Sequence, residues 1–380
     1  MNDNFFTEEQ NMLREMVRDF TNNELKPVAA KIDEDEAIPP EIINKIKELG
    51  LLGAPFPLEY GGSGFGEVGY CIVQEEIGRG CLSTATMIGA HCSIGTNAIY
   101  IGGDEQLKQR FVVPCASGEK IAAFALTEQG AGSDAFNLKT KAYLDGNEWV
   151  INGEKLWITN GPFADVFSVF ARTNLGITGF VVEKGTPGFT PGAPERKMGI
   201  RGSKTSSLTF DNVRVPKDNM IGKEGKGFLI AMKTLDAGRL GLGAACLGAC
   251  KELLELSTKY AKERKQFDEP IANFQAVQFM LSEMAIEIYV LDTLLYHTAK
   301  LYDSGEMLSR QAAMVKYVAS MALDKCADLA IQIHGGMGYS RELPIERFYR
   351  DSRINRIFEG TSEVQKLVIA RDIIKRNGKM

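Results

Sequence analysis

The sequence predicts a multi-domain α+β protein, with an N-terminal α-helical domain, a middle β domain of barrel or sandwich type and a C-terminal four-helix bundle. Three observations support this prediction. Apolar residues recur with a helical period in the first third of the chain, alternating runs with turn signals follow, and long amphipathic stretches fill the remainder. We therefore expect domains over residues 1–120, 121–224 and 225–380.

The N-terminal region begins with the stretch "TEEQNMLREMVRDFTNNEL". Its apolar residues at positions 12, 13, 16, 17 and 20 follow a period near 3.6, which predicts an amphipathic helix. Thr7 and Gln10 have the spacing of a capping box at its start. Pro39 and Pro40 predict the start of a second helix, which we expect to end at Gly50.

The middle region has the composition of a β domain. Asp145-Gly146 and Asn152-Gly153 separate short alternating runs, and both dipeptides are typical of two-residue hairpin turns. The sequence therefore predicts two successive hairpins here. Further strands are expected at residues 166–172, 178–184 and 207–215.

The C-terminal region returns to helical periodicity. Long amphipathic stretches at about 226–264, 271–304, 308–333 and 360–376 with short connections predict a four-helix bundle. The run "LGLGAACLGAC" (240–250) is far shorter than the roughly 20 residues that cross a bilayer. Its small residues predict a helix packed tightly against a neighbour, and we expect no stable membrane insertion.

Composition and charge exclude several classes of function. The net charge of −5 gives no electrostatic footprint for nucleic acid. The basic clusters 262–265 and 347–356 are either solvated helix faces or a site for one phosphorylated ligand. Seven cysteines without a CxxC pair and only three histidines make a protein-bound metal unexpected and indicate a reducing compartment. No targeting segment is recognisable at the N-terminus, which predicts a cytoplasmic protein.

Two stretches of the middle region could contact a cofactor. "ALTEQGAGSD" (125–134) combines hydroxyls with glycines that permit close backbone approach, although it could also be a decorated turn. "KLWITNG" (155–161) places Trp157 and Thr159 two residues apart, so both belong to one face of a strand. This indole is either the wall of a site for a planar group or an ordinary core residue.

Two stretches near the C-terminus could also contribute residues to a catalytic or binding site. "IQIHGGMGY" (331–339) allows close backbone approach at adjacent glycines, or is a simple helix–loop–helix corner. "RINRIFEGTSEVQ" (353–365) places Glu359 after an apolar pair and before Gly360 and Thr361. The carboxylate there is either a catalytic base or an acid stabilised by the positive end of the next helix.

Five motifs together resemble the acyl-CoA dehydrogenase family over essentially the whole chain: "LTEQGAGSD", "WITNG", "ERKQF", "QIHGGMGY" and "IFEGTSEVQ". The resemblance implies the three-domain architecture already expected from periodicity. It also implies FAD held non-covalently between domains and subunits, and a homotetramer arranged as a dimer of dimers.

The resemblance further implies roles for particular residues. Positions matching FAD contacts are Phe124, Leu126, Thr127, Gly132, Ser133, Trp157, Ile158, Thr159, Arg264, Gln266, Phe267, Gln275, Gln332, Gly335, Gly336, Thr361 and Glu363. Of these, Arg264 to Gln275 and Gln332 to Gly336 match contacts to the FAD of a neighbouring subunit. Positions matching the acyl-CoA site are Ala85, Gly89, Ser133, Asp236, Arg239, Phe358 and Gly360.

Glu359 matches the family's catalytic base, which takes the α-proton of an acyl-CoA thioester while flavin N5 takes the β-hydride. Electrons would then pass to an electron-transfer flavoprotein. Some branches carry their base at the position of Gly238, where this chain has no carboxylate. Asp236 and Arg239 match residues near the active site, and the alternative for Arg239 is a helix-surface cation.

The acyl group is not fixed by the sequence. Ala85 and Gly89 are small residues where medium-chain members carry larger polar ones, whereas other stretches resemble very-long-chain, short-chain, branched-chain and some cyclic-acyl members. His91 is either a polar residue of the acyl cavity or a hydrogen-bonded buried histidine, and we expect the second. The competing functions are an acyl-CoA oxidase that uses O2 and a non-catalytic assembly or scaffold protein on the same fold.

Overall fold

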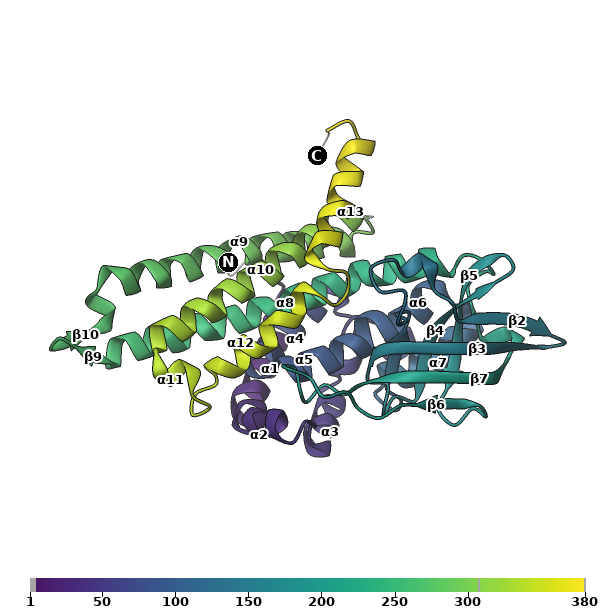
Figure 1. Cartoon of the computed structure of the whole chain (residues 1–380), viewed down its shortest axis with the longest axis horizontal. Coiled ribbons are helices and arrows are strands. Elements are labelled where there is room, and N and C mark those ends of the chain that lie inside the picture. Colours follow the sequence, from purple (N-terminus) through teal and green to yellow (C-terminus); the bar gives the residue numbers. More distant parts are fainter. Residues whose placement is uncertain (1–4, 307, 379–380) are drawn as a thin grey trace.

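The computed structural model describes residues 5–306 and 308–378. Helices form the first and last parts of the described chain and a sheet lies between them, so the predicted fold class is confirmed. Figure 1 shows the sheet at one end of the molecule, with the long helices α8, α9 and α10 extending to the other end. Their bounds are Gly227–Glu263, Gln275–Asp303 and Ser309–His334.

The N-terminal region is helical, as predicted. The capping box is present, because the side chains of Thr7 and Gln10 each accept a hydrogen bond from the other residue's backbone N–H. The α-helices are α1 (Glu8–Phe20), α2 (Ala29–Glu34), α3 (Pro40–Glu48), α4 (Gly66–Gly80), α5 (Leu82–Gly89), α6 (Asn97–Gly102) and α7 (Glu105–Ala116). A π-helical segment, Ala90–Thr96, joins α5 to α6.

The middle region forms a mixed sheet with the order β6-β7-β3-β2-β4-β5-β8, and β1 pairs in parallel with β4. The strands are β1 (Ala122–Ala125), β2 (Lys141–Asp145), β3 (Glu148–Thr159), β4 (Val166–Thr173), β5 (Gly176–Glu183), β6 (Phe189–Pro191), β7 (Thr205–Pro216) and β8 (Met220–Ile221). The hairpin predicted at Asp145 and Gly146 joins β2 to β3.

The second predicted hairpin, at Asn152 and Gly153, is wrong. Strand β3 continues through this dipeptide, and its register with β7 shifts between Ile151 and Gly153, as at a β-bulge. Gly153 has φ of +144°, and a Cβ there would lie 2.6 Å from Oγ1 of Thr140. The glycine therefore serves a close contact within the sheet, which the dipeptide alone does not distinguish from a turn.

The C-terminal region contains the four predicted long helices and two short ones. The hairpin of β9 (Lys265–Gln266) and β10 (Glu269–Pro270) joins α8 to α9. The remaining helices are α11 (Gly336–Tyr339), α12 (Ile345–Ser352) and α13 (Ser362–Lys375). Figure 1 shows that α13 rises away from the other three long helices.

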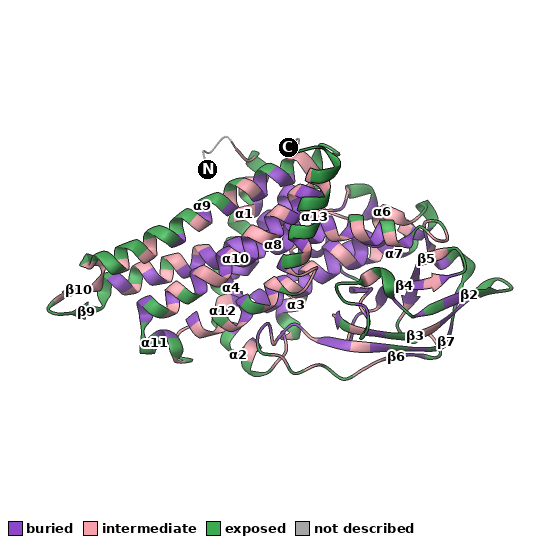
Figure 2. Ribbon diagram, turned by 45° about the horizontal axis from the view of Figure 1, so that its top comes forward, coloured by how far each residue is buried: buried purple, intermediate pink, exposed green. Residues whose placement is uncertain are grey.

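Helix α8 packs against α4 through small residues, as the Gly/Ala-rich run predicted. A Cβ on Gly248 would lie 1.8 Å from the carbonyl oxygen of Glu75, and one on Gly78 would lie 2.4 Å from that of Ala245. Figure 2 shows buried residues along α4, α8 and α10, and an exposed β9–β10 end. In the described ranges, no helix combines the length and apolarity needed to span a membrane.

Candidate active site

Glu359 lies in a tight turn between two helical segments. A 3₁₀ turn, Arg353–Arg356, precedes it, and Thr361 begins α13 by accepting a hydrogen bond from the N–H of Val364 at 3.2 Å. Glu359 has φ of +53° and Gly360 has φ of +89°. A left-handed conformation at a non-glycine residue costs roughly 1–2 kcal/mol, so other contacts must hold the turn.

The carboxylate of Glu359 lies against the backbone of α8. A Cβ on Gly238 would be only 2.6 Å from Oε2 of Glu359, so this glycine makes room for the carboxyl group. Glu359 is half-buried as a residue, but Oε2 is shielded from solvent and has no hydrogen-bond partner among the described residues. Burial raises the pKa of Glu359 to about 7, and the positive charges of Arg239 and Lys316 only partly oppose this shift.

A charged pair on α8 lies close to Glu359. Arg239 is 6% exposed and its Nη1 is 2.6 Å from Oδ1 of Asp236, whose other oxygen accepts a hydrogen bond from Ser309. Arg239 is therefore a buried cation, and the alternative of a helix-surface cation is wrong. Its Nε has no hydrogen-bond partner within the described ranges.

The alternative role for Glu359, an acid at the start of α13, has no support in the hydrogen bonds. Thr361 caps the helix, and the acidic residue in its first turn is Glu363. The Glu359 side chain accepts no hydrogen bond from α13, because Oε2 is unpartnered and lies against α8. The backbone N–H of Glu359 also has no partner among the described residues.

Two residues that the sequence analysis missed hold the backbone around Glu359. Nζ of Lys316, on α10, donates to the carbonyl oxygen of Gly360 at 2.7 Å. Nε2 of Gln365 donates to the carbonyl oxygens of Glu359 at 3.2 Å and Gly360 at 2.9 Å. The available signal for Lys316 was a lone cation within the apolar run "AAMVKYVAS".

The two middle-domain stretches lie side by side. The N–H of Leu156 donates to the carbonyl oxygen of Thr127 at 2.9 Å, which joins β3 to the glycine-containing loop. Trp157 is 57% exposed although Ile158 beside it is buried, and a Cβ on Gly132 would meet no atom within 4 Å. An exposed indole beside an open loop fits a flat, ring-containing group such as the flavin of FAD.

Buried residues of the predicted cofactor site pack beneath the exposed ones. Phe124 and Leu126 belong to a hydrophobic cluster with Phe170, and the rings of Phe124 and Phe170 are 5.1 Å apart. Thr159 is half-buried, and Ser133 is exposed on the loop. Trp157 itself lies at an irregularity of β3, because the register with β7 shifts between Lys155 and Ile158 and Trp157 has φ of +60°.

A buried ion pair, also missed from the sequence, fixes the loop to the sheet. Nζ of Lys155 lies 2.7 Å from Oε1 of Glu128 and donates to the carbonyl oxygen of Leu126 at 3.1 Å. Glu128 accepts in turn from the N–H groups of Lys139 and Thr140. The Lys155 side chain is fully buried, so loss of either partner would leave an uncompensated charge.

Most of the remaining predicted FAD positions lie at the end of the molecule opposite the sheet. The β9–β10 hairpin and α11 occupy the end of the long helices farthest from the sheet in Figure 1. Residues at this end include Phe267, which is 89% exposed, and Arg264, Gln266, Gln275, Gln332, Gly335 and Gly336. One chain therefore does not bring these residues together with Trp157, whereas Thr361 and Glu363 lie beside Glu359.

The predicted acyl-cavity residues lie on α5. Ala85 is 1% exposed, whereas Gly89 is partly exposed, and a Cβ there would lie 3.4 Å from Nε2 of Gln74. Phe358 is partly buried against the main core. His91 bonds through both nitrogens, to the N–H of Ala122 and the carbonyl of Cys115, which confirms the expected hydrogen-bonded role.

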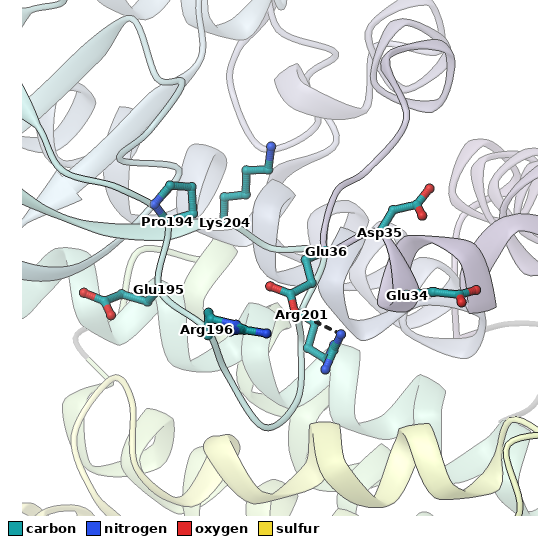
Figure 3. A pocket seen from close by; sticks show the side chains of 8 residues that line it. All are labelled: Glu34, Asp35, Glu36, Pro194, Glu195, Arg196, Arg201 and Lys204. Carbon is teal, nitrogen blue, oxygen red and sulfur yellow. Dashed lines mark ion pairs between the residues drawn. The ribbon is translucent and has the colours of Figure 1, made fainter.

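Two pockets lie away from Glu359 in the described chain. The larger, of about 480 Å³, is a charged groove between α2 and the segment that joins β6 to β7. Figure 3 shows Glu36 and Arg201 paired across it, at 2.9 Å. The second, of about 280 Å³, lies beside Lys155 and Leu156. Neither is lined by Glu359.

The basic cluster 347–356 is partly neutralised by ion pairs. Arg350 pairs with Asp33 and Glu346, both through contacts of 2.7 Å. Arg356 pairs with Asp324 at 3.0 Å. These pairs favour a structural role for both arginines over a phosphate site.

Comparison with known proteins identifies the family. Models of the acyl-CoA dehydrogenase N-terminal, middle and C-terminal domains match residues 7–119, 123–213 and 225–374. A short-chain specific acyl-CoA dehydrogenase from Clostridium acetobutylicum is 45% identical over 97% of this chain and 99% of its own length. An acryloyl-CoA reductase (NADH) from Anaerotignum propionicum is 44% identical over 97% of this chain and 95% of its own.

Comparison with solved structures identifies the same family. Butyryl-CoA dehydrogenase from Megasphaera elsdenii superposes with a TM-score of 0.95 at 39% identity, covering 98% of this chain and 100% of that one. An acyl-CoA dehydrogenase from Bacillus anthracis in complex with FAD gives 0.93 at 37% identity, covering 99% of this chain and 69% of that one. The chain belongs to the acyl-CoA dehydrogenase family and is an FAD-dependent oxidoreductase that acts on CH–CH bonds.

Proposed function

We propose that this enzyme converts an acyl-CoA thioester to the trans-2-enoyl-CoA, with Glu359 as the base that removes the α-proton. The observation that carries the proposal is the position of the Glu359 carboxylate, whose unpartnered oxygen Oε2 is shielded from water against Gly238. A carboxylate without competing donors in a dry site is a stronger base than one in water.

The pKa of about 7 suits this role. Near neutral pH a sizeable fraction of Glu359 is ionised and able to accept the α-proton, and the product acid is stable enough to hold it. The free N–H of Glu359 is available to the thioester oxygen, on which negative charge grows as the proton leaves. Loss of one such donor typically costs roughly 3–4 kcal/mol of transition-state stabilisation.

The residues on the sheet side would hold the flavin. We assign Thr127, Gly132, Ser133, Trp157 and Thr159 to its binding, supported by Phe124, Leu126 and Ile158, with Thr361 and Glu363 near the adenosine diphosphate part. When bound, FAD supplies an acceptor, at flavin N5, for the hydride that leaves the β-carbon. Trp157 would orient the ring, and the Glu128–Lys155 pair would fix the loop that lines it.

The residues at the far end of the bundle would complete the cofactor site of another subunit. These residues lie on or beside the β9–β10 hairpin and α11, at the end of the long helices farthest from the sheet in Figure 1, whereas Trp157 lies in β3 of that sheet; they are Arg264, Gln266, Phe267, Gln275, Gln332, Gly335 and Gly336. The exposed ring of Phe267 supports contact with another copy. We therefore propose a homotetramer arranged as a dimer of dimers.

A short-chain acyl group is the substrate that the relatives favour, because two of them are named short-chain specific acyl-CoA dehydrogenase and butyryl-CoA dehydrogenase. Ser133, Asp236, Arg239, Phe358 and Gly360 would surround the acyl-CoA, with Ala85 and Gly89 beneath its acyl end. An electron-transfer flavoprotein would then take the electrons, as part of fatty-acid β-oxidation.

A reductase acting in the opposite direction is the second candidate, because the relative from Anaerotignum propionicum is named an acryloyl-CoA reductase. The same Glu359 would then return a proton to the α-carbon. The oxidase alternative gains no support from the relatives reported above, and oxygen consumption in the presence of acyl-CoA tests it.

Anaerobic bleaching of the flavin absorbance tests the proposal. The panel contains butyryl-, isobutyryl-, octanoyl- and palmitoyl-CoA, with Glu359→Gln as the matched variant and crotonyl-CoA plus reduced enzyme for the reverse direction. We expect butyryl-CoA to bleach the parent enzyme and to bind the variant without bleaching it. Bleaching of the variant at the parent rate would show that Glu359 is not the base.

A further inference from the structure

Lys316 is an unusual residue in the helical core. It lies in the N-terminal third of α10 (Ser309–His334) and is fully buried, a position that lysine almost never takes without a partner. Its hydrogen bond goes to the carbonyl oxygen of Gly360 at 2.7 Å, and it forms no ion pair within 4 Å among the described residues. A buried ammonium held by a single carbonyl is costly, which calls for a functional reason.

The bonded carbonyl belongs to the turn that presents Glu359. Both Glu359 and Gly360 have positive φ, and Gln365 is the second donor to their carbonyls. A Cβ on Gly360 would lie 2.6 Å from Nε2 of Gln365, so glycine is needed for this donor to approach. The donors on α10 and α13 thus hold two successive peptide groups in a conformation that the chain would otherwise avoid.

The charges around this turn are few. The groups that act on Lys316 are Glu359 and Glu363 from the C-terminal segment, and Cys246 and Arg239 from α8. Burial lowers the pKa of Lys316 to about 8, and Glu359 provides the largest opposing effect. The groups that act on Glu359 are Arg239 and Lys316, and Arg239 is already paired with Asp236.

We propose that Lys316 is a positioning residue for Glu359: it holds the Gly360 carbonyl, thereby keeps the carboxylate against Gly238, and supplies a buried positive charge that favours the ionised form of the base. This inference rests on the proposed role of Glu359. Gln365 shares the first task, because it bonds the same carbonyl, but not the second, because it is neutral.

Three variants separate these tasks. Lys316→Met removes both the donor and the charge at similar length, Lys316→Arg restores the charge, and Gln365→Leu removes a donor without changing charge. Lys325→Met is the matched control, since Lys325 lies on the same helix and makes only surface ion pairs with Glu283 and Glu287. Glu359→Gln completes the set.

The readouts are the rate of anaerobic flavin reduction by butyryl-CoA between pH 5.5 and 9, the FAD content and the thermal unfolding temperature. For Lys316→Met we expect a fall of about 10²-fold in the reduction rate, as for a misplaced catalytic group. The acidic limb of its pH profile should also move to higher pH, because the ionised base has lost a favourable charge. Lys316→Arg should return the limb towards the parent position.

Gln365→Leu should lower the rate of flavin reduction without moving the acidic limb of the pH profile. This variant keeps the positioning of the turn by its hydrogen-bond donors testable if Lys316→Met does not fold. Lys325→Met should behave as the parent. The inference is overturned if Lys316→Met folds with FAD and keeps both the parent rate and the parent limb, or if only its unfolding temperature changes. Parent-like reduction by Glu359→Gln would instead refute the base itself, and the positioning role would fall with it.

Discussion

Gly238→Ala is the substitution that most directly tests the placement of Glu359. The added methyl group would lie 2.6 Å from Oε2 of Glu359 and 2.9 Å from Cγ2 of Ile94, and real Cβ atoms essentially never approach others within 3.0 Å. The methyl group is enclosed on both sides, so relief requires the carboxylate to move. The required shift is at least 0.4 Å, the difference between 3.0 Å and 2.6 Å.

The size of the effect follows from this displacement. A misplacement of about 1 Å costs roughly 10²-fold in rate, so we expect flavin reduction by butyryl-CoA to slow by about ten- to a hundredfold. Overpacking costs about 1–3 kcal/mol, partly offset by the roughly 0.5–1 kcal/mol that alanine gains over glycine in a helix. The enzyme should therefore still fold and bind FAD, and the loss should appear in the chemical step.

The assay is anaerobic stopped-flow reduction at saturating butyryl-CoA, with FAD content and thermal unfolding measured on the same samples. Gly80→Ala is the matched control, because its methyl group would lie 2.7 Å from Cγ2 of Thr21 and would contact Leu25 and Lys26, and not the Glu359 carboxylate. It should lose stability but keep the parent rate. A parent rate for Gly238→Ala would refute the geometry on which the base assignment depends.

Three further predictions concern pH, the cofactor loop and the subunit contact. Burial raises the pKa of Glu359 from 4.5 to about 7, so its ionisation destabilises the folded state above pH 7 and not below pH 4.5. Glu359→Gln should therefore raise the free energy of unfolding by up to about 3 kcal/mol at pH 8 and little at pH 4.5, as chemical denaturation would show. Lys155→Met should leave the buried Glu128 carboxylate without its ion-pair partner, which costs roughly 3–5 kcal/mol of stability. This variant should also contain less FAD and show altered flavin absorbance. An unchanged flavin spectrum would contradict the role given to the Glu128–Lys155 pair. Phe267→Asp should weaken subunit association and FAD retention together in sedimentation and absorbance measurements, whereas full FAD retention by a dissociated chain would contradict a shared site.

The three-part architecture could be read from the sequence because it depends on local patterns. Helical periodicity, the Thr7 capping box and the turn at Asp145 and Gly146 each act over a few residues, and each appears where it was predicted. Asn152 and Gly153 show the limit of this approach. A glycine with positive φ serves a turn and a bulge equally well, and only the contact with Thr140 across the sheet distinguishes them.

The residue types of the site could also be predicted from the sequence, because Glu359, Trp157 and the glycines near them belong to distinctive motifs. The surroundings of these residues could not be predicted in this way. The Gly238 surface that shields Oε2, the Lys316 bond to Gly360 and the Glu128–Lys155 pair all join segments that are distant in sequence. Burial and charge proximity depend on how such segments pack in three dimensions, so the tertiary structure alone set the strength of the base and the rigidity of its turn.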